Sequence, residues 1–115
     1  MPMTFKKGAS SEKPPHIANN NAFLGDCFTS DTDKEHQITS GFYRQEAGTP
    51  LVYNYDYDEM KVILEGNFTM KDETGYEVTA GPGDTFYFKK GCTITFSSTD
   101  YGLAFFVGLR PKGTA

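Results

Sequence analysis

Residues 53–66 read Tyr53-Asn54-Tyr55-Asp56-Tyr57-Asp58-Glu59-Met60-Lys61-Val62-Ile63-Leu64-Glu65-Gly66. Successive side chains of a β-strand point to opposite faces, so an extended run places every second residue on one face. That face carries three phenols, one carboxylate and one amine, from Tyr53, Tyr55, Tyr57, Glu59 and Lys61. Large aromatic side chains favour cover over solvent. We therefore interpret this face as the lining of a pocket; the alternative is an edge strand whose tyrosines and charges are solvated.

Short segments separated by turn residues surround this run. Gly 12 and Pro 6 divide the chain, and no window keeps an apolar period typical of a long helix. The expected strands cover residues 22–29, 36–46 (as one strand or as two broken at Gly41), 53–66, 68–71, 76–80, 85–88, 93–97 and 103–109. Many short strands at this spacing predict an all-β sandwich or barrel.

The length of 115 residues predicts a single domain. Residues 1–20 are polar and contain adjacent prolines, so we expect a flexible N-terminal arm there and the barrel over residues 21–112. A chain this short buries a modest core, which a homodimer would extend.

Charge and hydropathy exclude several classes of partner. The net charge of −4 and the pI of about 5.0 argue against nucleic acid, which proteins bind through basic patches. No apolar run has membrane-spanning length, and the N-terminus lacks the apolar core of a signal peptide. We therefore expect a cytoplasmic protein that contacts no membrane, with Cys27 and Cys92 reduced.

Two spaced motifs resemble those of the cupins, which are double-stranded β-helix barrels of the jelly-roll type. The usual first motif, His-x-His, three or four residues, Glu, six residues and Gly, is matched in spacing by Tyr53, Tyr55, Glu59 and Gly66. The usual second motif, Gly, five residues, Pro-x-Gly, two residues and His, is matched by Gly83, 89–91 and Ile94. Within the cupins, the sequence is most similar to the ethanolamine-utilisation Q (EutQ-like) type, in residues 57–60, 63–66 and 80–84. The resemblance implies a single-domain cupin barrel and a homodimer.

The chain departs from the cupin pattern at the metal ligands. Most cupins hold a divalent metal with three His and one Glu, but Tyr53, Tyr55 and Ile94 stand at the His positions and only Glu59 remains. A neutral phenol is a poor ligand for a divalent ion, and Ile94 has no donor atom. We therefore expect no tightly bound metal and no cofactor. A weak metal bound by His36 or His16 with Glu59 is the alternative.

The polar face suggests acid–base chemistry in place of metal chemistry. Buried among aromatics, Glu59 would act as a general acid, whereas beside Lys61 it would be a carboxylate general base. The tyrosines would donate hydrogen bonds to a substrate oxygen. A β-bulge after Glu59 would turn Lys61 to the other face. The expected catalytic residues are Glu59, Tyr53, Tyr55 and Lys61, and the expected substrate-binding residues are Tyr57, Tyr87, Arg44, His36 and Phe96.

The function expected from these residues is a metal-independent enzyme acting on a small molecule, of the lyase, isomerase, dehydratase or cyclase type. Two alternatives stay open. The resemblance implies an ethanolamine-utilisation accessory protein with acetate-kinase-like activity, although no glycine-rich phosphate loop precedes a helix. The third reading is a ligand-binding module without catalysis, because a fold alone does not confer activity.

Overall fold

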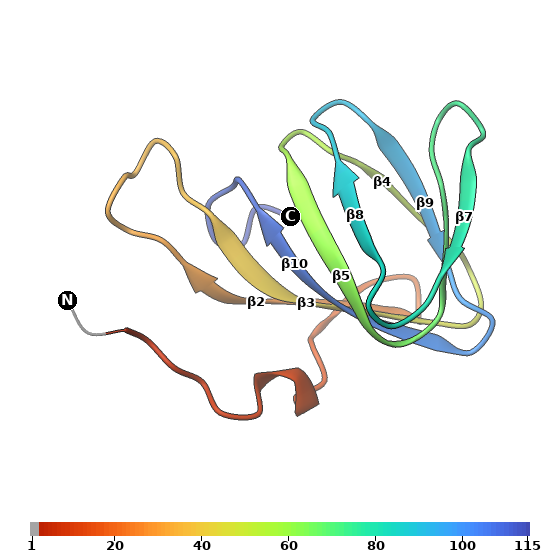
Figure 1. Ribbon diagram of the computed structural model, residues 1–115, viewed down its shortest axis with the longest axis horizontal. Helices are drawn as coiled ribbons and strands as arrows, with labels where there is room; N and C mark the ends of the chain where they lie inside the picture. The colour runs from red at the N-terminus through yellow and green to blue at the C-terminus, as the bar shows by residue number, and fades with distance from the viewer. Residues whose placement is uncertain (1–2) are drawn as a thin grey trace.

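Two antiparallel sheets face each other in the computed structural model, which describes residues 3–115 (Figure 1). The larger sheet has the strand order β1-β2-β3-β10-β5-β8, and the smaller has the order β4-β9-β6-β7. The strands are β1 (His16–Ala18), β2 (Ala22–Thr29), β3 (Thr39–Glu46), β4 (Leu51–Asn54), β5 (Glu59–Gly66), β6 (Phe68–Lys71), β7 (Glu77–Ala80), β8 (Thr85–Phe88), β9 (Thr93–Ser97) and β10 (Tyr101–Gly108). A single 3-10 turn, η1 (Ala9–Ser11), precedes them. The all-β prediction is confirmed.

β10 is an inner strand of the larger sheet. It pairs with β3 along one edge and with β5 along the other. Its sequence is apolar at nearly every position, as expected of a strand flanked by partners on both sides. Buried Ala104 and Phe106 point toward the smaller sheet. β10 therefore fixes the position of β5, which carries the charged residues singled out above.

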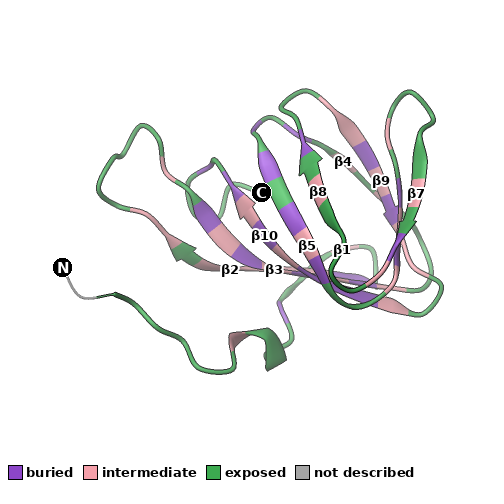
Figure 2. Ribbon diagram, viewed as in Figure 1, coloured by how far each residue is buried: buried purple, intermediate pink, exposed green. Residues whose placement is uncertain are grey.

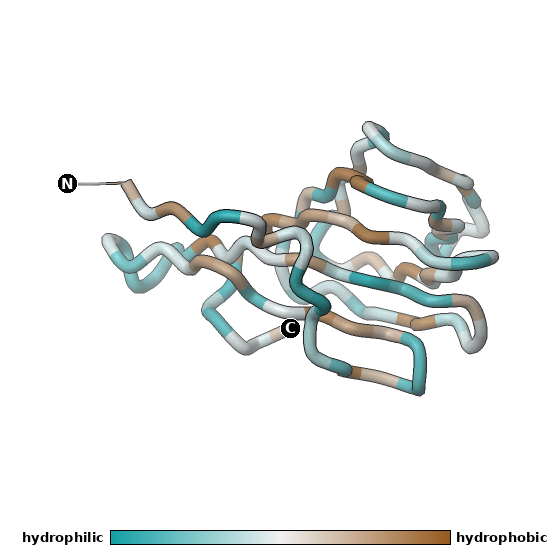
Figure 3. The backbone as a smooth tube through the Cα atoms, turned by 90° about the horizontal axis from the view of Figure 1, so that it is seen from below, coloured by the Kyte–Doolittle hydropathy of each residue, from teal (hydrophilic) through white to brown (hydrophobic). Residues whose placement is uncertain are grey.

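The core between the sheets consists largely of aromatic rings. Tyr43 and Phe88 each meet Phe96 edge to face, with ring centroids 5.3 and 5.7 Å apart. Such pairs contribute about 0.5–1.5 kcal/mol each beyond the burial of apolar area. Buried and exposed residues alternate along the first part of β5 (Figure 2). Apolar and polar segments likewise interleave along the backbone (Figure 3). One face of each sheet thus covers the core.

The prediction of one continuous strand over residues 53–66 was wrong. The run forms two strands, β4 and β5, joined by residues 55–58. Tyr55 continues the pairing of β4 beyond Asn54, with the residues that precede β9. Its N–H donates to Cys92 O (2.9 Å), and its C=O accepts from Gly91 N (2.6 Å). The chain then crosses to the larger sheet, where Leu109 N donates to Asp58 O. This crossing lets one short run contribute side chains to both walls of the barrel.

Two further segments differ in their bounds from the predictions. β3 is one strand through Gly41, in agreement with the single-strand alternative, but it begins at Thr39. The last residues of the expected N-terminal arm include β1, which pairs with β2. Among residues 3–115, no helix is long and apolar enough to cross a membrane.

Candidate functional site

A cavity of about 220 Å³ opens between the two sheets. Its lining is mostly aromatic and aliphatic, with one carboxylate and one amine among the side chains. Both sheets, the crossing between them and the C-terminal segment contribute residues to the lining. These residues are Ile17, Ala18, Leu24, Tyr43, Leu51, Tyr53, Tyr55, Tyr57, Glu59, Lys61, Phe96 and Ala115. A concave apolar site with a few convergent polar groups is the usual form of a small-molecule site.

The charged part of the lining is a buried pair on β5. Glu59 and Lys61 are two residues apart, so both point inward, and no bulge turns Lys61 away. Lys61 Nζ lies 3.4 Å from Glu59 Oε2, and both side chains are 2% exposed. The Tyr55 hydroxyl donates a 2.5 Å hydrogen bond to the same carboxylate oxygen. The Lys61 amine and the Tyr55 hydroxyl therefore both contact the same oxygen atom of the Glu59 carboxylate.

Four aromatic rings surround the amine of Lys61. Its Nζ lies 4.6 Å from the ring centroid of Tyr43, 5.1 Å from Phe96, 5.6 Å from Phe106 and 5.9 Å from Phe88. Aromatic faces attract a cation, whereas the loss of water disfavours it. Burial lowers the pKa of Lys61 below its usual 10.5, and the neighbouring Glu59 charge offsets part of this effect.

Three tyrosines form one cluster on the cavity wall. Tyr53 and Tyr57 share a hydrogen bond between their hydroxyls (2.9 Å). The ring of Tyr55 lies edge to face against both neighbours, at 4.7 and 5.4 Å. Burial raises the pKa of each of the three phenols, most strongly for Tyr55, where the Glu59 charge adds to the effect. All three are therefore protonated hydrogen-bond donors at neutral pH.

A buried ion pair joins the segment after β10 to β2. Arg110 binds Asp26 of β2 through two hydrogen bonds, of 3.0 and 2.7 Å, and Gly113 N donates to the same carboxylate (2.7 Å). Burial alone would raise the pKa of Asp26, but the hydrogen bonds from Arg110 and Gly113 lower it overall. The Arg110 guanidinium also lies 5.5 Å from the ring of Tyr57. The ion pair therefore contacts the tyrosine cluster through Tyr57. It also holds the C-terminal segment, whose last residue, Ala115, lines the cavity.

Comparisons with known proteins agree on the fold. A family model described as ethanolamine utilisation protein EutQ matches residues 15–110. The chain belongs to the EutQ family. No curated protein gave a significant match to it.

Solved structures place the EutQ-family chain among the cupins. A protein of unknown function from Rhizobium leguminosarum bv. viciae 3841 is 25% identical, with 96% of this chain and 100% of that chain covered and a TM-score of 0.73. The EutQ protein from Salmonella typhimurium LT2 is 24% identical, with 76% and 68% covered and a TM-score of 0.66. Ectoine synthase from P. lautus is 13% identical, with 96% and 79% covered and a TM-score of 0.73. DMSP lyases and a cupin-superfamily sugar phosphate isomerase share the fold. The cupin prediction is confirmed.

The structure brings six of the nine predicted site residues of this EutQ-family chain to one cavity. They are the four expected catalytic residues, with Tyr57 and Phe96 from the expected substrate-binding set: Tyr53, Tyr55, Tyr57, Glu59, Lys61 and Phe96. The parity argument therefore identified the correct face, although the run is not one strand. The catalytic and binding roles of these residues remain predictions.

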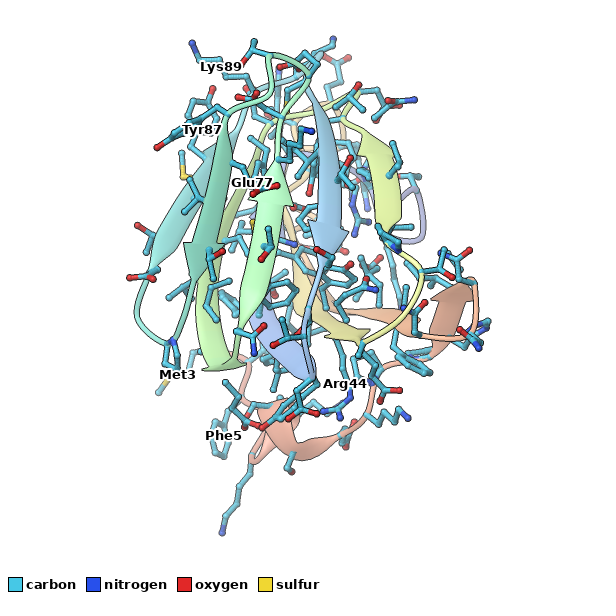
Figure 4. All side chains as sticks on the ribbon, turned by 90° about the vertical axis from the view of Figure 1, so that its right-hand side faces the viewer. Met3, Phe5, Arg44, Glu77, Tyr87 and Lys89 are labelled. Carbon is cyan, nitrogen blue, oxygen red and sulfur yellow. The ribbon has the colours of Figure 1, made fainter. Side chains whose placement is uncertain are left out.

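The other three predicted residues lie away from the cavity. Tyr87 occupies an outward position of β8, is 51% exposed and donates to Asp58. Arg44 points outward from β3, where it binds Glu46 and stacks on the ring of Tyr101. Figure 4 shows Tyr87 at the left edge of the molecule. His36 is exposed in the loop before β3, where it contacts Asp33.

Sequence reasoning missed Tyr43 and Arg110. Tyr43 lies on the inward parity of β3, adjacent to Arg44, and its hydroxyl donates to Gln45. Buried and half-buried residues alternate along β3, and Tyr43 lies at a buried position. No local signal marks Arg110, whose partner Asp26 is 84 residues away along the chain.

The residues at the cupin metal positions do not fit a divalent cation in this EutQ-family chain. Tyr53 and Tyr55 are protonated phenols, Ile94 has no donor, and the Glu59 carboxylate already faces the Lys61 ammonium. Both histidines are exposed, and neither lines the cavity. Among residues 3–115, no three His, Cys, Asp or Glu side chains come together as a metal-binding group.

Proposed function

We propose that this EutQ-family cupin is a metal-independent acid–base enzyme acting on a small molecule, of the lyase, isomerase, dehydratase or cyclase type. One observation carries the proposal: the Tyr55 hydroxyl and the Lys61 amine both contact one carboxylate oxygen of Glu59 in the wall of the cavity. The cupin neighbours include lyases, an isomerase and a synthase, which supports chemistry of this general kind.

Glu59 is the group that takes the proton. Its carboxylate lies beside the Lys61 amine and can act as a general base that removes a proton from carbon or oxygen of a bound substrate. Tyr55 holds that carboxylate in place with its 2.5 Å hydrogen bond. After it has taken the proton, the same carboxyl group can return it to the substrate.

The tyrosine pair supplies the second element of catalysis. Removing a proton next to a carbonyl places negative charge on its oxygen, and fixed donors in a site of low polarity stabilise that charge. The hydroxyls of Tyr53 and Tyr57 lie on the cavity wall and share one hydrogen bond, so the acceptor of that pair donates its own proton elsewhere. A substrate carbonyl is a suitable acceptor.

Solvent-deuterium exchange tests this proposal whatever product the reaction gives. The protein is incubated in D₂O with a panel of small aldehydes, ketones, keto acids and hydroxy acids, and loss of carbon-bound protons is followed by NMR. We expect exchange on at least one compound class, and a loss of about 100-fold or more in the Glu59→Gln variant, in line with removal of a general base. Tyr87→Phe is the matched control, since Tyr87 lies outside the cavity. Exchange that survives Glu59→Gln would refute the proposal.

Membership of the EutQ family supports a second candidate, an ethanolamine-utilisation accessory protein with acetate-kinase-like activity. It predicts nucleotide-dependent phosphorylation of acetate in the presence of magnesium, which a coupled assay on the purified chain detects. If neither phosphorylation nor proton exchange occurs, but a metabolite binds unchanged, the chain is a non-catalytic binding module.

A further inference from the structure

We propose that Lys61 is a covalent catalytic residue that condenses with a small aldehyde or ketone to form an imine. The inference rests on the acid–base function proposed above and names the substrate class of that same cavity. It assigns Lys61 a role beyond balancing the charge of Glu59.

The first support is the position of the amine. Lys61 is one of the residues that line the cavity, and its side chain is 2% exposed. Aromatic rings surround it, and Glu59 is the one acidic group within 4.0 Å of Nζ among the described residues. The eight other lysines are exposed. Lys61 is therefore chemically distinct from every other lysine of the chain.

The second support is the protonation state that this position favours. An imine forms only from the neutral amine, and enzymes obtain a reactive lysine by burying it in an apolar pocket. Burial lowers the pKa of Lys61, against the opposing effect of Glu59. Each unit by which the pKa falls raises the fraction of neutral amine at pH 7 about tenfold.

The third support is a proton carrier beside the amine. In the condensation, the Lys61 nitrogen forms a bond to the carbonyl carbon, and the carbon–oxygen double bond opens to a carbinolamine. Nitrogen then loses its two protons, the carbon–oxygen bond breaks, and the oxygen leaves as water. Glu59 Oε2 lies 3.4 Å from Nζ, so its carboxylate can take these protons from nitrogen and pass them to the departing oxygen.

The imine then makes the proposed acid–base chemistry easier. When protonated, it withdraws electrons from the neighbouring carbon more strongly than the parent carbonyl does. Glu59 can remove a proton from that carbon to give an enamine, and Glu59 can return it. Addition of water reverses the condensation and restores the amine, so no oxidant or reductant enters the cycle.

Borohydride trapping tests the inference directly. The intact protein is mixed at pH 7 with acetaldehyde, acetone or pyruvate, reduced with borohydride, and digested for mass spectrometry of each lysine-containing peptide. We expect the Lys61 peptide to be labelled at least about tenfold faster than the peptide of exposed Lys71. Labels confined to exposed lysines, or an unlabelled Lys61 with all three probes, would overturn the proposal.

Variants separate this inference from the proposed function on which it rests. Lys61→Met should lose the fast adduct while Lys71→Met keeps it, with circular dichroism as the check on folding. Glu59-dependent deuterium exchange without any Lys61 adduct refutes the imine and leaves the acid–base function standing. A Lys61 adduct without Glu59-dependent exchange supports the imine and refutes the proposed base. The peptide map of the wild-type protein decides the matter even if Lys61→Met does not fold.

Discussion

Glu59 and Lys61 place two opposite charges on the inward face of one strand, in contact with aromatic rings. Removing two charges from water costs several kcal/mol per ion, and their mutual attraction returns that cost only when both partners are present. A buried ion pair of this kind is therefore expected to add little to the stability of the fold. The proposed acid–base chemistry is a reason for keeping both groups in one cavity.

A double-mutant cycle checks this view of the pair. Glu59→Gln alone leaves Lys61 buried without its counter-charge, and we expect the free energy of unfolding to fall by about 3 kcal/mol. The combined variant Glu59→Gln with Lys61→Met should recover most of that loss, since no buried charge remains. Urea denaturation of the four proteins gives the coupling energy. A combined variant as unstable as the sum of the single variants would show that the two residues do not interact.

The buried phenols predict a loss of stability in alkali. Tyr43, Tyr55 and Tyr57 have pKa values raised above the usual 10.0, chiefly by burial. Above pH 10.0 the unfolded chain loses these protons while the folded chain keeps them, so the free energy of unfolding falls as the pH rises. Below that pH their contribution is constant. The urea midpoint, measured from neutral pH upward, should decline from about pH 10. Tyr55→Phe should make the decline shallower, whereas Tyr87→Phe, at an exposed position, serves as the comparison.

At the scale of the elements, the strands with local signals were predicted well. Residues 68–71, 85–88 and 93–97 form strands with the predicted bounds, because alternation and short turns rich in Gly, Asp, Ser or Thr define their ends. The run over 53–66 was predicted as one strand, because an unbroken alternation does not reveal where a chain changes sheets. Its inward face was nevertheless correct, since Tyr55 and Tyr57 keep pointing inward through the crossing.

Residues that depend on distant partners could not be found in this way. The bond between Arg110 and Asp26 joins the end of the barrel to β2, and nothing near either residue predicts the other. Arg44 was expected to bind substrate because a guanidinium can hold a carboxylate or phosphate through two hydrogen bonds. In the structure it lies on the half-buried outward face of β3, where it stacks on Tyr101, and it does not line the cavity.

The contact between β2 and β3 predicts a sharp effect of one methyl group. A Cβ added at Gly41 would lie 2.1 Å from the carbonyl oxygen of Gly25 and 2.6 Å from the ring of Phe106. Because the first neighbour is backbone, the strands must separate, and we expect Gly41→Ala to lower the free energy of unfolding by at least about 2 kcal/mol. At Gly81 the nearest atom to an added Cβ is 3.9 Å away. Gly81→Ala is therefore the matched control in a thermal melt, and equal melting temperatures would contradict the packing seen at Gly41.

At the scale of the whole molecule, this chain combines a cupin barrel with a cavity whose donors do not suit a metal. We expect elemental mass spectrometry of protein purified without chelators to find substoichiometric metal. Deuterium exchange should be unchanged by EDTA, since the proposed mechanism uses Glu59 and the tyrosines and no metal. One transition-metal ion per chain, together with exchange lost on chelation and restored by that metal, would overturn metal independence. The expected homodimer also stays a prediction, which light scattering of the purified protein checks.

The pairing of β10 has a consequence for how the chain folds during synthesis. β3 and β5 do not pair with each other; each pairs with β10, which follows every other strand in the sequence. Until the ribosome releases residues 101–108, both strands keep an unpaired edge, and the buried charges of β5 stay hydrated. The larger sheet therefore closes late, through contacts between segments far apart in sequence, a topology that folds slowly. A nascent chain stalled before β10 should be captured by chaperones and cut by proteases that spare the finished protein.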